Sequence, residues 1–125
     1  MILDTNALSA WAEGNAAIRP LLSSAEKLVV PSVVLGEFDF GIRQSRHYRR
    51  YTEWLERSVR NTEVAVVDEE TARIYGEIRL ALKKAGTPIP VNDAWIAATA
   101  LQLDLPILSR DAHFDSVVRV RRVAW

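Results

Sequence analysis

Short apolar runs alternate with longer amphipathic stretches along this 125-residue chain. The apolar runs, rich in β-branched residues, predict strands at residues 2–3, 27–30, 63–67, 106–108 and 117–120, the last at the edge of a sheet. The longer stretches predict helices at residues 7–11, 16–24, 33–43, 47–61, 69–85 and 93–103, the last of which is apolar nearly all round. This alternation is typical of the α/β class, with a mainly parallel central sheet of four to five strands covered on both faces.

Residues at the element boundaries support this division. Ser32 is expected to N-cap the helix that carries Glu37, Asp68 the helix that starts near residue 69, and Asn92 the helix after it. Gly86 is expected to end the helix over residues 69–85. The continuous apolar run at residues 64–67 favours a strand buried on both faces.

The composition narrows the class of protein. The length favours one domain over residues 1–125, and 49% hydrophobic with 26% charged residues is ordinary for a soluble globular protein. The absence of cysteine excludes disulfides, thiolate metal sites and a cysteine nucleophile. The N-terminus runs straight into a strand and no segment has the length of a membrane span, so we expect a cytoplasmic protein with no membrane partner.

Charge is balanced overall, but basic residues are clustered. Sixteen Lys and Arg offset sixteen Asp and Glu, which argues against a sequence-blind nucleic-acid binder. The densest basic cluster follows the helix over residues 33–43 and contains Arg43, Arg46, Arg49, Arg50, Tyr48 and Tyr51, and smaller clusters are Arg57 with Arg60, Lys83 with Lys84, and Arg119 with Arg121 and Arg122. Three interpretations of the densest cluster remain: a surface that binds RNA phosphates, a face that binds an acidic protein segment, or a solvated helix face.

Four acidic residues stand where a strand ends or a helix begins. Asp4 ends the first strand, Asp111 follows the strand over residues 106–108, Asp93 opens a helix and Glu37 lies in the second turn of another. Ligands of a parallel α/β sheet bind beyond the carboxyl ends of its strands. Four carboxylates gathered there repel one another unless cations neutralise them, and their oxygens suit Mg²⁺ or Mn²⁺. The pattern therefore predicts a metal site.

Each acid also has a structural alternative. Asp4 could simply cap the following helix, Asp93 could complement a helix dipole, and Glu37 could lie on an exposed helix face. Asp111 could be an ordinary loop residue. Against the second alternative, the helix after Asp93 is apolar nearly all round, which indicates burial.

Taken together, four segments resemble the PIN-domain family, in particular its VapC-type toxin ribonucleases. They are Ile-Leu-Asp-Thr-Asn at residues 2–6, Val-Pro-Ser-Val-Val-Leu-Gly-Glu at 30–37, Asn-Asp-Ala-Trp-Ile-Ala-Ala at 92–98, and Pro-Ile-Leu-Ser-Arg-Asp-Ala-His-Phe at 106–114. The resemblance covers essentially the whole chain, with the segments in the family's order. It implies a three-layer α/β/α domain and an endoribonuclease that hydrolyses phosphodiester bonds in single-stranded RNA with Mg²⁺ or Mn²⁺. Its implied partners are a single-stranded or structured RNA, a cognate antitoxin and a second copy in a homodimer.

The resemblance also assigns roles to residues. It implies a catalytic cluster of Asp4, Glu37, Asp93 and Asp111, with Asp4 and Asp93 as direct metal ligands. Thr5, Asn6 and Ser109, which lie in the matching segments, are candidates for binding the substrate, and the basic cluster adds Arg43 and Arg46. Ser109 stands where the family often has Thr, and the position of Asp111 varies between Asp and Asn.

Other function classes compete with this interpretation. A phosphoacceptor receiver domain would show paired acids after the first strand, and a haloacid-dehalogenase-type phosphatase would show Asp-x-Asp, whereas residues 4–6 hold a single acid. A catalytically inactive PIN-like module that binds RNA or a partner stays open. A general-base histidine pair, His47 and His113, finds little support because the two lie in unrelated segments.

Overall fold

The computed structural model describes residues 1–125, which fold around a sheet of five strands in the order β3-β2-β1-β4-β5. Every neighbouring pair of strands is parallel. The strands are β1 (Ile2–Leu3), β2 (Val29–Pro31), β3 (Glu63–Ala65), β4 (Ile107–Leu108) and β5 (Arg122–Val123). The helices are α1 (Thr5–Ala12), α2 (Arg19–Ser24), α3 (Ser32–Arg43), α4 (Tyr48–Val59), α5 (Glu69–Ala85) and α6 (Val91–Leu103), with a short 3₁₀ helix at Ala112–Ser116.

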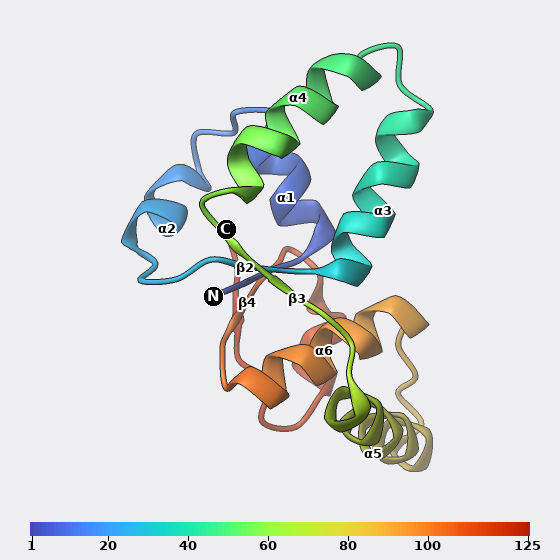
Figure 1. The fold of residues 1–125 in the computed structure, drawn as a ribbon. Coiled ribbons are helices and arrows are strands. Elements are labelled where there is room, and N and C mark those ends of the chain that lie inside the picture. The colour runs from blue at the N-terminus through green and yellow to red at the C-terminus, as the bar shows by residue number, and fades with distance from the viewer.

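The sheet is the middle of three layers, as the sequence predicts. Helices α1 to α4 lie on one side of it, and α5 and α6 lie on the other (Figure 1). The first strand sits between β2 and β4, so a crossover separates it from β4. No helix of the chain is long and apolar enough to cross a membrane.

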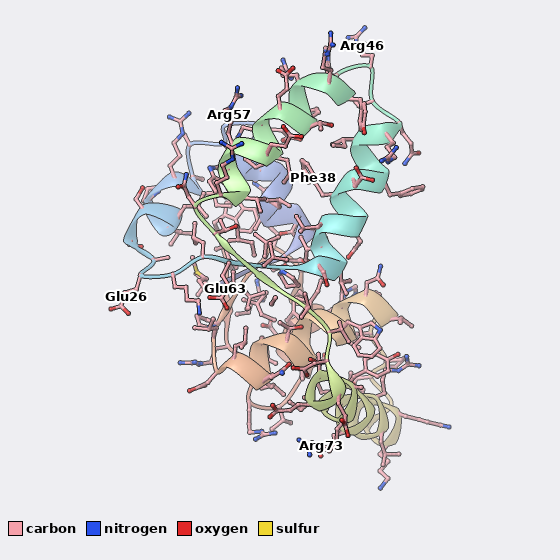
Figure 2. All side chains as sticks on the ribbon, viewed as in Figure 1. Glu26, Phe38, Arg46, Arg57, Glu63 and Arg73 are labelled. Carbon is pink, nitrogen blue, oxygen red and sulfur yellow. The ribbon has the colours of Figure 1, made fainter.

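The core fills the space between the sheet and each helical layer. Ile2 and Leu3 of β1 pair with Ile107 and Leu108 of β4, and all four side chains are fully buried. Six of the 13 residues of α6 are buried, which confirms the burial indicated by its apolar sequence. On the opposite side, α1, α3 and α4 meet through an aromatic cluster in which Phe38 points inward (Figure 2).

The predicted caps divide into two groups. Asp68 caps α5 in a reciprocal capping box with Thr71, and Gly86 ends the same helix with φ of 69°, as predicted. The predictions for Ser32 and Asn92 are wrong, because both residues lie inside their helices and neither side chain caps. Prolines stand at both cap positions, where the ring holds the extended backbone that precedes the first turn.

Two strand predictions are also wrong. Residues 117–120 form no strand, because Arg119 has a left-handed φ of 70° and breaks extended structure; β5 begins only at Arg122. The run at residues 64–67 is not buried on both faces either. Its strand, β3, is an edge strand, and Val64, Val66 and Val67 are exposed. The other predicted ends lie within three residues of the observed ones.

Candidate functional site

All four predicted acids lie at the edge of the sheet where the parallel strands end. Asp4 follows β1, and Asp111 lies beyond the end of β4. Since β1 and β4 are parallel neighbours in the sheet, both residues lie at the same edge. Glu37 comes from α3 and Asp93 from the first turn of α6, two helices that contact each other. Figure 1 shows the start of α3 and the start of α6 at this one edge.

Asp4 is buried and its carboxylate is held in place from three directions. Its Oδ1 accepts a hydrogen bond of 2.7 Å from the backbone N–H of Thr5. Its Oδ2 accepts bonds from Asn6 Nδ2 at 2.8 Å and from the Ser109 hydroxyl at 2.6 Å. Asn6 also donates to Ser109 Oγ at 3.1 Å, so a closed triangle of side chains ties the end of β1 to the loop after β4.

Asp93 and Asp111 converge on one histidine. Nδ1 of His113 lies 3.0 Å from Oδ2 of Asp93 and 2.9 Å from Oδ1 of Asp111. The ligand atoms of these three residues all lie within 4.8 Å of one another. The Asp111 carboxylate is oriented by the backbone N–H of His113, and its own N–H donates to Ser109 Oγ. Ser109 therefore links this cluster to Asp4.

Glu37 approaches from the other side with an unsatisfied atom. The side chain is half-buried, and its Oε1 is buried without a hydrogen-bond partner. Thr5 Oγ1 is in the same state, and both residues line a pocket of about 320 Å³ between α1 and α3. A buried carboxylate oxygen with no protein partner is costly unless a ligand or a cation satisfies it.

Burial and neighbouring charges shift the pKa values of the residues in the cluster. Burial raises the pKa of Asp4, with smaller contributions from the charges of Asp93 and Glu37, while the hydrogen bond from Ser109 opposes the rise. Burial likewise raises the pKa of Asp93, against the hydrogen bond from His113. That same bond raises the pKa of His113. The edge concentrates negative charge that protein groups only partly neutralise.

The basic cluster of the α3–α4 region lies apart from the acids. Arg46 projects at the tip where α3 turns into α4 (Figure 2), and it forms no ion pair. Arg43 bonds to Asp39 at 2.6 Å, one helical turn earlier. The rings of Tyr48 and Tyr51 are half-buried, and the guanidinium groups of Arg43 and Arg50 lie over them.

A comparison with models of protein families identifies the family of this chain. The model described as PIN domain matches residues 1–120, and therefore includes all four acids. The chain belongs to the PIN-domain family.

Curated relatives and solved structures agree with that assignment. Ribonuclease VapC5 of Mycobacterium tuberculosis is 30% identical over 121 residues, which cover 93% of this chain and 86% of the relative. A DNA-bound VapBC structure from Salmonella typhimurium matches with a TM-score of 0.89 and 25% identity, covering 99% of this chain and 96% of that one. The FitAcB structure from Neisseria gonorrhoeae matches with a TM-score of 0.86 and 28% identity, covering 97% and 94% of the two chains.

Within this PIN domain, two residues near the acids make contacts that the sequence pattern does not predict. The sequence offers His113 only as a candidate general base, although its position two residues after Asp111 signals proximity to the site. Arg122 belongs in the sequence only to a basic cluster. It donates to the Ser109 carbonyl at 3.2 Å and pairs with Asp115 at 2.7 Å, which braces the loop that carries Ser109 and Asp111.

The donors of the PIN site fit a hard divalent cation. Mg²⁺ and Mn²⁺ prefer carboxylate oxygens, and Asp4, Asp93, Asp111 and Glu37 supply them at one edge. The unpartnered Oε1 of Glu37 is an oxygen that such a cation can bind, and a positive charge would stabilise the ionised carboxylates of Asp4 and Asp93, whose pKa values are raised by burial.

Proposed function

We propose that this chain is a metal-dependent endoribonuclease that hydrolyses phosphodiester bonds in single-stranded RNA and serves as the toxin of a toxin–antitoxin pair. The observation that carries the proposal is the meeting of four carboxylates at the carboxyl edge of a PIN-domain sheet. Relatives named as ribonucleases and solved complexes named VapBC support the activity and the antitoxin partner. The working unit is a single PIN-like domain over residues 1–125, acting in the cytoplasm as a homodimer.

In this proposal Asp93 and Asp4 hold a Mg²⁺ or Mn²⁺ ion, and Asp111 and Glu37 complete the cluster. The ion supplies charge neutralisation at the phosphate and a water of lowered pKa. Asp4 retains one lone pair on Oδ1 beyond its bond to Thr5, and that lone pair is its free donor.

Other residues position the acids or the RNA. Asn6 and Ser109 fix the Asp4 carboxylate through their hydrogen bonds, which makes them positioning residues as well as neighbours of the substrate. Thr5 and Glu37 line the pocket between α1 and α3, which is wide enough for a ribose or a base. Arg46 and Arg43 stand farther out and contact phosphates away from the scissile bond.

The deciding experiment measures cleavage of a labelled single-stranded RNA by the purified chain free of antitoxin. Cleavage is expected with Mg²⁺ or Mn²⁺ and is expected to disappear with EDTA and in Asp4→Asn. Asp104→Asn is the matched control, because Asp104 lies at the far end of α6 from Asp93 and its left-handed backbone suits Asn. Full activity of Asp4→Asn, or full activity in EDTA, contradicts the proposal.

The same assay separates the catalytically inactive alternative. An inactive PIN-like module would retain RNA binding in a filter assay but would leave the RNA intact under every metal condition. A cognate antitoxin is expected to suppress cleavage when it is added in equimolar amount.

A further inference from the structure

Nδ1 of His113 lies close to the carboxylates of both Asp93 and Asp111. A neutral imidazole has one N–H, and even a protonated ring carries only one hydrogen on Nδ1. Yet Nδ1 lies within 3.0 Å of a carboxylate oxygen of both Asp93 and Asp111. One hydrogen therefore serves two acidic oxygens, each of which can accept more.

The same distances suit three ligands of one ion. Donors about 2.1 Å from an octahedral ion and at right angles to each other lie about 3.0 Å apart. The two distances from His113 Nδ1, 3.0 Å to Asp93 and 2.9 Å to Asp111, match that separation. An ion bound there would take the place of the Nδ1 hydrogen and interact with both carboxylates. A neutral ring would then carry its one hydrogen on Nε2, and a protonated ring would release its Nδ1 proton to solvent.

The access and anchoring of the ring also fit a ligand. The side chain of His113 is 49% exposed, whereas that of Asp93 is only 14% exposed, so an ion can enter from the solvent side past the ring. Its backbone is fixed within the 3₁₀ helix Ala112–Ser116, whose N-cap is Asp111. His113 therefore lies two residues after Asp111, within the turn that Asp111 caps.

We propose that Nδ1 of His113 is a direct ligand of the divalent ion held by Asp93 and Asp111, and that this nitrogen makes the site prefer Mn²⁺ to Mg²⁺. The inference rests on the proposed metal-dependent function and names a ligand that the four-acid pattern does not contain. Mg²⁺ strongly prefers oxygen donors, whereas affinity for an imidazole nitrogen rises along the transition metals that begin with Mn²⁺.

Metal binding to the full-length, antitoxin-free chain tests the proposal without reference to catalysis. Isothermal titration with Mn²⁺ and with Mg²⁺ is expected to show at least about tenfold tighter binding of Mn²⁺ by the wild type. His113→Gln retains a side chain that can hydrogen-bond to Asp93 but removes the imidazole. It is expected to lose about tenfold in Mn²⁺ affinity and less than about threefold in Mg²⁺ affinity. His113→Ala repeats the test in case the Gln amide itself binds the ion.

A spectroscopic measurement identifies the ligand directly. Pulsed electron paramagnetic resonance of the Mn²⁺-bound wild type is expected to show coupling to a directly bound ¹⁴N nucleus, and this coupling is expected to be absent in His113→Gln. His47→Ala is the matched control and keeps the coupling, because His47 is exposed at the start of α4. Circular dichroism checks that each variant is folded.

The outcomes are distinct from those of the ribonuclease assay. No nitrogen coupling in the wild type, coupling that survives in His113→Gln, or an equal loss of Mn²⁺ and Mg²⁺ affinity each overturns the ligand assignment. If the chain cleaves RNA but shows one of these results, only the inference about His113 fails. If nitrogen coupling is found but no RNA is cleaved, the ligand assignment stands and the proposed ribonuclease function fails.

Discussion

The hydroxyl of Ser109 donates a 2.6 Å hydrogen bond to Oδ2 of Asp4, although the two residues are 105 positions apart in the chain. The Ser109 hydroxyl oxygen in turn accepts a 2.9 Å bond from the backbone N–H of Asp111. One fully buried hydroxyl therefore orients two of the four acids, and it links the ends of the adjacent strands β1 and β4.

Ser109→Ala is expected to destabilise the protein and to slow RNA cleavage. Removing a buried donor leaves Asp4 Oδ2 short of a partner, at a cost of about 1–3 kcal/mol in the free energy of unfolding. Urea denaturation measures that loss, and cleavage is expected to fall about tenfold because the acids lose their common support. Ser109→Thr keeps the hydroxyl and is expected to restore both values. Wild-type stability and activity in Ser109→Ala would falsify this role.

The position of the acids at the carboxyl edge of the sheet follows from local rules. A residue that ends a parallel strand lies at the sheet's carboxyl edge whatever the details of packing, and Asp4 and Asp111 needed no more than that. Helix α5 was predicted at its observed ends because a capping box at Asp68 and a left-handed glycine at Gly86 are both encoded locally.

The parts that were missed depend on tertiary contacts. The strand order places β3 at the edge, and that order decides that Val64 and Val66 face solvent; their apolar character alone indicates burial. The approach of His113 to Asp93 joins the 3₁₀ helix to α6 across 20 residues of sequence. No periodicity along the chain records that contact, so His113 was visible only as the neighbour of Asp111.

Asp4→Asn is expected to abolish cleavage and to change how the stability of the metal-free protein depends on pH. The buried carboxylate of Asp4 has a raised pKa, which means that the fold disfavours its charged form. Asn removes that charge, but its single amide oxygen cannot replace both carboxylate oxygens, which accept from Thr5, Asn6 and Ser109. The lost hydrogen bonds are expected to lower the melting temperature at pH 4, and the removed charge is expected to make this loss smaller at pH 8. Differential scanning calorimetry in EDTA measures the change.

The pH dependence of that difference has a definite sign. Because folding raises the pKa of Asp4 from 3.8, the folded state binds more protons than the unfolded state between 3.8 and the raised value. The stability contributed by Asp4 is therefore highest below that window, falls as the pH rises through it, and stays low above it. The stability of Asp4→Asn relative to the wild type is expected to be highest at pH 8 and to fall toward pH 4; a relative stability that grows on acidification contradicts the assignment.

Arg46 and Arg43 are expected to differ in their contribution to RNA binding. Both are exposed, but Arg43 bonds to Asp39, whereas Arg46 has no acidic partner. If the tip of α3 and α4 contacts phosphates, Arg46→Ala is expected to lower the slope of log K against log salt by about 0.7, the value for one phosphate of a single strand. Arg43→Ala is expected to have a smaller effect because Asp39 already offsets its charge. Filter binding between 50 and 200 mM salt is a suitable range, and equal slopes for Arg46→Ala and wild type would place the RNA elsewhere.

Arg122 is expected to act on the metal site without touching it. Its guanidinium donates to the Ser109 carbonyl at 3.2 Å and pairs with Asp115 at 2.7 Å, so it fixes the backbone that leads to Asp111. Arg122→Ala is expected to weaken Mn²⁺ binding and to lower kcat, each by about tenfold, with little change in KM, because supporting groups tune ligands rather than bind substrate.

Arg121→Ala is the matched control, since Arg121 pairs with the remote and exposed Asp104. If Arg122 instead contacted RNA phosphates, its removal would raise KM and flatten the salt dependence of binding while Mn²⁺ affinity stayed unchanged. Calorimetric titration of the two variants with Mn²⁺, alongside steady-state kinetics, separates a brace for the Ser109–Asp111 loop from a phosphate contact.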